Sequence, residues 1–452
     1  MLKINQLLFF ERVSPTKLSL TFLASCFVFV SATKSAEAAK EVSINKVDRS
    51  SLDNASNLYT AKDEKKTCQL YYGTNSKLEV VADGLENPRR ISFGPDNALY
   101  VTEAGTGGPE GLIIGPELNT TLGFGLTGAV TRVQNGSQER VVSGLPSLAL
   151  TPPGTIPPQT VGSPLSAVGP HDVGFAQNGD AYVLLGFAST ANQKSILGPA
   201  GEDLGKLISF SINTDGSWER NTDSSIDLLA QKELYNPYDN GDYLNNPYDL
   251  EVQSNNFVIA DPGGNNFFTA NTTGNVSLNS RFAPRSVNGV SVESVPTSIT
   301  VGPDGAYYLG EYTGAPYPEG GARIYRVLPG EEPEVYADGF TQITGLDFDD
   351  EGNLYVLEYS TNSTIDPNAE LTGALIQLAP DGTRKTIVGP GEGLVSPNGL
   401  AIGPDGAIYV SNNSTVIGEG QVVRIERSAS VPEPSSTLGS SRKRVRMSCS
   451  DE

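Results

Sequence analysis

Short runs of alternating apolar and polar residues recur along most of the chain. The stretch GPDGAIYVSNN begins at Gly403, and close copies of it begin at Gly94 and Gly302. In each copy, alternating apolar residues on both sides of the turn predict two short strands. Pro-Asp-Gly between them is typical of a type I turn, because Pro presets its own φ and Gly can adopt a positive φ. Each copy therefore predicts a β-hairpin.

Six such hairpins follow one another with a basal spacing of about 50 residues, which is typical of repeat architectures. They begin at Glu86, Gly169, Asn246, Val295, Ile343 and Ser396. A second hairpin follows most copies, most clearly from Ala322 and Ala374. The copy at Asn246 has no readable second half and counts as a unit on its spacing alone. Four strands in each of six units predict an all-β, six-bladed β-propeller.

The two ends of the repeat region predict how the ring closes. The sixth copy loses its pattern after GQVVRIERS from Gly420, so it lacks an outer strand. The segment KLEVVADGL from Lys77 has no partner before it and matches the outer strand EVYADGF of another unit. Residues 78–83 are therefore expected to complete the last blade, and the propeller to span residues 77–427.

One face of the ring collects polar side chains. Antiparallel strands of equal length return to the same level, so the residues after each leading Pro lie at the level of the second-strand ends. The first positions are Arg89, His171, Tyr248, Thr297, Thr344 and Asn398; the next are Arg90, Asp172, Asp249, Ser298, Gly345 and Gly399; the strand ends are Glu103, Leu185, Asp261, Glu311, Glu358 and Asn412. The candidates for ligand binding at this channel mouth are Arg90, His171, Asp172, Asp249, Asn398 and Asn412.

The acids at the strand ends allow two interpretations. Oxygen ligands from Glu103, Asp261, Glu311 and Glu358 could hold Ca²⁺ or another divalent cation. They could equally be solvated or accept backbone hydrogen bonds. His171, the one His of the chain, could act as a base, a ligand or a structural group. A single His argues against a His-rich zinc site or a serine triad.

Four insertions lengthen the first two units and project from the face that carries the acids. They begin at Ala104, Pro146, Phe187 and Asn221. Loops gathered on one face of a rigid scaffold often carry function. In the last insertion, Tyr235, Tyr238 and Tyr243 could stack on an aromatic ligand or pack the loop against the propeller.

The net charge and the N-terminal residues indicate which partners the protein can have and where it is located. The 452 residues carry a formal net charge of −21, which argues against nucleic acid and anionic membranes as partners. The apolar run from Leu18 to Val30, followed by Ala36-Glu37-Ala38, predicts a signal peptide over residues 1–38 and a secreted, periplasmic or extracellular protein. Loss of this leader, which carries a net +2, would bring the net charge to −23. An alternative is a lipoprotein cleavage box ending at Cys26.

Residues 39–76 form a polar lead-in that is expected to be poorly ordered. Outside the leader only Cys68 and Cys449 remain, and two Cys do not make a disulfide framework.

The repeated phrase resembles NHL-repeat propellers, and more closely the cyanobacterial ScyD/ScyE family. The resemblance rests on VVADGLENPRRISFGPDNALYVTEAGTGG from Val80 and VPTSITVGPDGAYYLGEYTGAPYP from Val295, and it covers residues 77–427. It implies a six-bladed propeller outside the cytoplasm, in a family associated with the scytonemin sunscreen gene cluster whose biochemical activity is not established. Members need not act on scytonemin.

The tail, residues 428–452, carries a second resemblance. VPEPSSTLG from Val431 is similar to the start of a PEP-CTERM sorting signal, which continues into a membrane helix. Here SSRKRVRMSCSDE follows Gly439 and contains no apolar span, so no stable transmembrane anchor is expected.

Three functional hypotheses follow, and they leave open whether the protein is an enzyme. The favoured one is a secreted, monomeric propeller that binds a small molecule, glycan or protein on its loop-decorated face, linked to extracellular pigment or matrix. The alternative is a metal-dependent propeller hydrolase or lactonase with a cation at the channel mouth. An oxidoreductase acting on an indolic-phenolic pigment precursor rests on the family resemblance alone.

Overall fold

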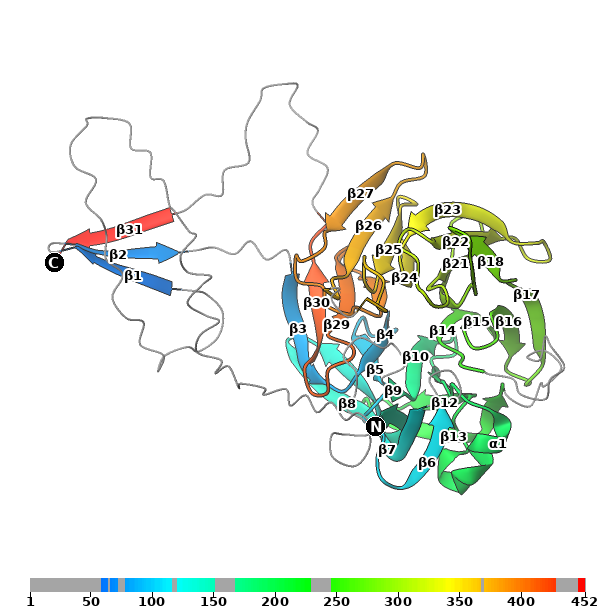
Figure 1. Ribbon diagram of the computed structural model, residues 1–452. Helices are drawn as coiled ribbons and strands as arrows, with labels where there is room; N and C mark the ends of the chain where they lie inside the picture. Colours follow the sequence, from blue (N-terminus) through cyan, green and yellow to red (C-terminus); the bar gives the residue numbers. More distant parts are fainter. Residues whose placement is uncertain are drawn as a thin grey trace, which may run out of the picture. The chain divides into compact units, whose positions relative to one another are not determined.

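Six antiparallel sheets succeed one another along the chain and form the blades of a β-propeller (Figure 1). The computed structural model describes residues 58–63, 66–71, 78–115, 120–150, 167–228, 245–366, 370–427 and 446–451. The chain divides into two units, Asn75–Thr437 and a unit made of Met1–Thr74 with Leu438–Glu452. The predicted six-bladed, all-β architecture is confirmed by the sheet order in the larger unit.

The strands of each blade follow in sequence from the channel outward. Blade 1 contains β4 (Pro88–Phe93), β5 (Leu99–Glu103), β7 (Thr120–Gln134) and β8 (Ser137–Leu150), with β6 (Gly111–Gly115) on β7 and β9 (Ala167–Val168) on β8. Blade 2 contains β10 (Pro170–Phe175), β11 (Ala181–Leu185), β12 (Lys206–Ile212) and β13 (Trp218–Asp227). Blade 3 contains β14 (Asp249–Gln253), β15 (Asn256–Asp261), β16 (Asn266–Asn271) and β17 (Val276–Arg281), so the copy without a readable second half is a complete blade.

The remaining blades keep the same order. Blade 4 contains β20 (Pro296–Val301), β21 (Tyr307–Glu311), β22 (Ala322–Val327) and β23 (Glu334–Phe340). Blade 5 contains β24 (Ile343–Phe348), β25 (Leu354–Glu358), β26 (Ala374–Leu378) and β27 (Arg384–Val388). Blade 6 contains β28 (Leu400–Ile402), β29 (Ile408–Asn412), β30 (Gly420–Ile425) and, from the other end of the chain, β3 (Leu78–Leu85).

The closure predicted for the last blade is confirmed. Strand β3 pairs antiparallel with β30, and its Ala82 and Leu85 are buried in a cluster that also holds Ile91 and Val422. The N-terminal strand therefore contributes backbone hydrogen bonds and apolar packing to the joint between the sixth and first blades.

The Gly-Pro-Asp phrase has a packing role beyond the turn. In blade 1, Asp96 accepts hydrogen bonds from the Tyr100 hydroxyl (3.2 Å) and from the Arg132 guanidinium on β7 (2.7 Å). Asp304 does the same with Tyr308 and Arg326, and Asp405 with Tyr409 and Arg424. The turn acid thus ties the second and third strands of its blade together, which explains why the phrase recurs.

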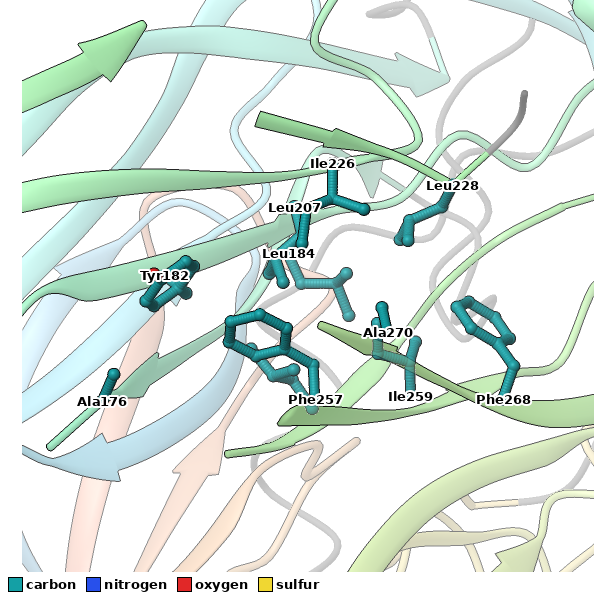
Figure 2. Packing of buried hydrophobic residues seen from close by; sticks show 11 residues of the cluster. Ala176, Tyr182, Leu184, Leu207, Ile226, Leu228, Phe257, Ile259, Phe268 and Ala270 are labelled. Carbon is teal, nitrogen blue, oxygen red and sulfur yellow. The ribbon is translucent and has the colours of Figure 1, made fainter. Parts of the chain in front are cut away.

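Apolar layers between neighbouring blades form the core. Figure 2 shows one layer, in which Leu184 and Leu207 of blade 2 face Phe257 and Ile259 of blade 3. These four side chains are almost fully buried. Alternate residues of the strands fill such layers, because successive side chains of a strand point to opposite faces.

The insertions build a small core of their own. Residues from β6, β7 and β8 pack with Phe187 and with Leu197, which follows the short helix α1 (Ala191–Ile196). The fourth insertion begins later than predicted, because β13 continues from Asn221 to Asp227. A hairpin that the sequence analysis missed, β18 (Arg285–Val287) with β19 (Val290–Val292), lies between blades 3 and 4 in the sequence.

The smaller unit contains an antiparallel sheet of β1 (Leu58–Asp63), β2 (Lys66–Tyr71) and β31 (Arg446–Asp451), in the order β1–β2–β31. The polar lead-in therefore contributes two strands, although its apolar alternation is too short to predict them. The backbone register places Cys68 opposite Cys449. The leader, residues 1–38, lies outside the described residues, as does most of the tail. No helix in the described part of the chain has the length and apolar character needed to cross a membrane.

Candidate functional site

The inner strands place the predicted channel residues through a recurring irregularity. Pro170, Pro296 and Ile343 pair with the ends of the second strands, and the register then shifts by one residue. The extra residues are His171, Thr297 and Thr344. Such a bulge re-aims a side chain at a strand end. The prediction that the leading residues lie beside the ends of the second strands is confirmed, since Pro88 pairs with Glu103.

The bulge residues join neighbouring blades. Thr297 donates to the carbonyl of Ile343 (2.6 Å), and Thr344 donates to the carbonyl of Pro397 (3.1 Å). His171 Nδ1 contacts the carbonyl of Pro247 at 2.9 Å in the equivalent place. Each of these side chains therefore bonds the leading residue of the next blade.

His171 is held as a neutral imidazole. Burial, together with the nearby Arg89 guanidinium, lowers the pKa of His171 to about 3. Its ring packs on Tyr248 with centroids 4.6 Å apart. A neutral ring that bonds a carbonyl through Nδ1 carries its proton on that nitrogen. These contacts make His171 a bridge between blades 2 and 3.

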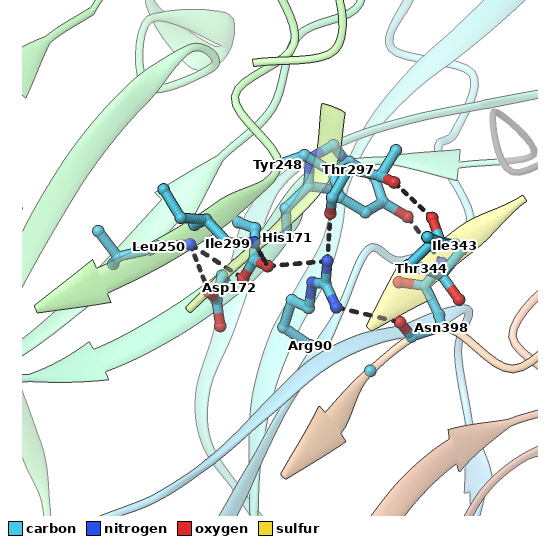
Figure 3. A network of polar contacts seen from close by, with 12 residues as sticks. Arg90, His171, Asp172, Tyr248, Leu250, Thr297, Ile299, Ile343, Thr344 and Asn398 are labelled. Atoms are coloured by element: carbon cyan, nitrogen blue, oxygen red, sulfur yellow. Dashed lines mark hydrogen bonds and ion pairs between the residues drawn. The ribbon is translucent and has the colours of Figure 1, made fainter. Parts of the chain in front are cut away.

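Arg90 crosses the channel axis (Figure 3). Its guanidinium forms an ion pair of 2.9 Å with Asp249 of blade 3 and donates to the carbonyl of Asn398 in blade 6 at 3.3 Å. It also donates to the carbonyl of Thr297 in blade 4. One side chain of blade 1 thereby links three other blades, and the Asn398 amide adds a hydrogen bond to the Tyr248 hydroxyl (2.7 Å).

Arg90 forms part of the wall of a cavity of about 280 Å³ that is lined by residues of the inner strands. Its polar wall consists of Arg90, Ser92, Asp172, Asp249, Glu251 and Asp347. Apolar side chains, including Phe93, Phe175 and Val252, line the rest. These three lie near the ends of their inner strands, so the lining runs from Arg90 toward the face that carries the Gly-Pro-Asp turns.

Three of the four carboxyl groups are fixed by the next blade. Asp172 accepts a hydrogen bond from the Leu250 amide, Asp249 from the Ile299 amide and Asp347 from the Ile402 amide, at 2.8, 2.7 and 2.8 Å. These backbone donors fix the orientation of the three carboxyl groups.

The pKa values of three acids that line the cavity are raised. Burial, and then Asp347 and Asp249, raise the pKa of Glu251 to about 8. Burial raises the pKa of Asp347 to about 7, although two backbone amides oppose this shift. Burial and the adjacent Asp249 carboxyl raise the pKa of Asp172 well above its usual range. Perturbed acids grouped in a cavity are a common mark of a functional site.

The strand-end acids are bonded to groups of their own blade or of the segment that precedes it. Glu103 accepts from Arg140 and from the Glu86 amide, and Asp261 from the Asn246 and Gly263 amides. Glu311 pairs with Arg285 of the missed hairpin, Glu358 accepts from the Thr341 amide, and Asn412 accepts from the Val395 amide. Among the described residues, no group of three or more His, Cys, Asp or Glu side chains is arranged to hold a metal ion.

The structure thus divides the predicted site residues. Arg90, Asp172 and Asp249 line one cavity, whereas His171 and Asn398 are buried and are not among its lining residues. Tyr235, Tyr238 and Tyr243 lie outside the described residues. Glu251 and Asp347 were missed, although Glu251 follows Asp249 by two residues and must share its side of the strand.

Comparisons with known proteins do not assign a family. No protein-family model matches the sequence, and a search of curated proteins finds no significant match. Among solved structures, a glucose dehydrogenase shares 15% identity with a TM-score of 0.43, over 78% of this chain and 99% of that one.

Two further structures are similar at the same level. The PQQ domain of pyranose dehydrogenase from Coprinopsis cinerea shares 10% identity with a TM-score of 0.40, over 77% of this chain and 95% of that one. Virginiamycin B lyase from Staphylococcus aureus shares 14% with a TM-score of 0.34, over 69% and 81%. Likeness of this degree carries no activity over to this chain.

Proposed function

We propose that the protein is a ligand-binding β-propeller whose central channel takes a small organic cation. The observation that carries this proposal is the cavity of about 280 Å³, whose wall contains four carboxyl groups and one guanidinium. An excess of acids in a concave, partly apolar space favours a positively charged guest.

The apolar part of the wall favours an organic cation over a bare metal ion. Phe93 and Phe175 line the cavity together with Val252, so a short carbon chain would contact apolar groups while its charged end meets the acids. A primary ammonium or guanidinium on a chain of about four carbons suits a cavity of this size.

The other expectations from the sequence stay proposals beside this one. Secretion rests on the predicted leader, and a role near extracellular pigment or matrix rests on the family resemblance. The metal-dependent hydrolase or lactonase is the rival, and it requires Glu103, Asp261, Glu311 and Glu358 to exchange their present hydrogen bonds for a shared cation.

Calorimetric titration of the protein without its leader would test the proposal. The probes are agmatine and putrescine, with 1,4-butanediol as a neutral match and CaCl₂ for the rival. We expect both amines to bind and the diol to give no heat. Binding of Ca²⁺ alone would favour the rival, and no binding by either amine would contradict the proposal.

A matched pair of variants would locate the site. Asp347→Asn keeps an oxygen that can accept from the Ile402 amide but removes an ionisable group from the cavity. We expect it to weaken agmatine binding about tenfold, equivalent to about 1.4 kcal/mol. Asp350→Asn, at an exposed turn position, should leave binding unchanged. Equal affinities of the two variants would place the ligand elsewhere.

A further inference from the structure

The cavity in the channel is lined by more carboxyl groups than positively charged groups. Among the residues that line the cavity, Arg90 is the one Lys or Arg, against the four acids Asp172, Asp249, Glu251 and Asp347. Its ion pair with Asp249 compensates one negative charge. Placing three further carboxylates in a confined space would cost a large electrostatic free energy, which protonation relieves.

Asp172 and Asp249 both line the cavity, and burial together with the Asp249 carboxyl raises the pKa of Asp172 well above its usual range. The amides of Leu250 and Ile299 hold the pair in place. With Arg90 paired to Asp249, a proton on Asp172 leaves this part of the cavity electrically balanced.

Glu251 and Asp347 are the other two acids that line the cavity. The charges of Asp347 and Asp249 help to raise the pKa of Glu251, and those of Asp249 and Asp349 help to raise the pKa of Asp347. The Phe348 and Ile402 amides donate to Asp347, so its partial ionisation is favoured over that of Glu251. Burial and mutual repulsion raise the pKa of Glu251 to about 8 and of Asp347 to about 7.

We propose that the channel exchanges protons for its ligand, so that a cation enters by displacing protons from Glu251 and its neighbours and leaves when they return. This inference rests on the proposed function and specifies how the site is regulated. In the exchange, a carboxylic acid loses its proton to the buffer and the resulting carboxylate pairs with the incoming ammonium or guanidinium. No bond other than O–H is broken.

The proton count is measured by titrating agmatine into the protein at pH 7 in phosphate and in Tris, which differ in protonation enthalpy. We expect the heats to differ by an amount that corresponds to release of about one proton per ligand. Affinity should rise up to about tenfold per pH unit between pH 6 and pH 8.

The outcomes separate this inference from the function on which it rests. Agmatine binding with equal heats in both buffers and no pH dependence would overturn proton exchange and leave the binding proposal intact. Affinity that falls as the pH rises would also overturn it. Absence of agmatine binding up to pH 9 would remove both.

Variants and a spectroscopic readout keep the test independent of folding. Glu251→Gln should lower the number of protons released and flatten the pH dependence, whereas the exposed Glu332→Gln should match the parent protein. In the unmodified chain, infrared difference spectra should show loss of protonated carboxyl absorption when agmatine is added. An unchanged carboxyl spectrum on binding would contradict the exchange.

Discussion

Arg90 and Asp249 meet at 2.9 Å across the central channel, although they belong to the first and third blades. Both are almost completely buried. Loss of the cation would leave the acids of the channel uncompensated, so Arg90→Gln is expected to lower the free energy of unfolding by about 3–5 kcal/mol. Urea denaturation at pH 7 measures this. The control Arg132→Gln removes an exposed pair with Asp96 and should cost less than about 1 kcal/mol; equal losses would contradict the interpretation.

The closing strand provides a second prediction. Deleting residues 40–84 removes most of β3 and exposes the edge of β30, so the melting temperature should fall by roughly 10 °C or more. Deleting residues 40–74 keeps β3 and should leave the melting temperature nearly unchanged. A similar fall in both deletions would mean that β3 adds little to the ring. Differential scanning calorimetry distinguishes these outcomes.

Gly94 lies against the ring of Tyr100, which leaves little room for a side chain at this position. A Cβ at this position would lie 2.5 Å from Cε2 of the buried Tyr100, so Gly94→Ala should cost about 2–3 kcal/mol through overpacking. At Gly389 the nearest atoms would lie 3.7 Å away, and Gly389→Ala should change stability by less than about 0.5 kcal/mol. Chemical denaturation of both variants checks this, and a neutral Gly94→Ala would show that the ring can move aside.

The acids of the cavity predict how stability varies with pH. The pKa of Glu251 is raised to about 8 and that of Asp347 to about 7, so the folded state keeps protons that the unfolded chain has lost above about pH 4. The contribution of these groups therefore falls as the pH rises from about 4 to about 8 and then levels off. Glu251→Gln should flatten this decline, with its largest stabilisation near pH 9, in thermal melts followed by circular dichroism. The same profile for parent and variant would contradict the assignment.

The predicted signal peptide determines which residue would begin the mature protein. Cleavage after Ala38 makes Ala39 the first residue, whereas the lipoprotein hypothesis makes a lipid-modified Cys26 the first residue. Intact-mass measurement of the exported protein separates these results. A protein that retains residues 1–38 would contradict both.

Much of the fold could be predicted from the sequence because turn chemistry repeats. Pro-Asp-Gly with flanking apolar residues marks several of the hairpins, including those that begin at Gly302 and Gly403, and the unmatched segment from Lys77 predicts the closure. The hairpin of β18 and β19 was missed although the sequence carries a local signal for it, since Asn288-Gly289 between Val287 and Val290 is typical of a two-residue hairpin turn.

The candidate site was only partly predictable. Period-two alternation places Asp172 and Asp249 in the channel, and the same rule extends to Glu251. The sequence does not reveal that the strand-end acids turn toward groups of their own blade or of the segment that precedes it, such as the Thr341 amide for Glu358. The bulges and the spacing between blades determine which of two nearby donors forms a hydrogen bond with an acid.

The sixth blade, assembled from β3 and β28–β30, has a consequence for biogenesis. The contact between Arg89 and Ser414 joins residues 325 positions apart, so the ring closes only after nearly the whole chain has been synthesised. A nascent chain with five blades still has an open sheet edge. Prematurely terminated chains would therefore form open rings that proteases degrade more readily. The complete chain would resist proteases because its ring is closed.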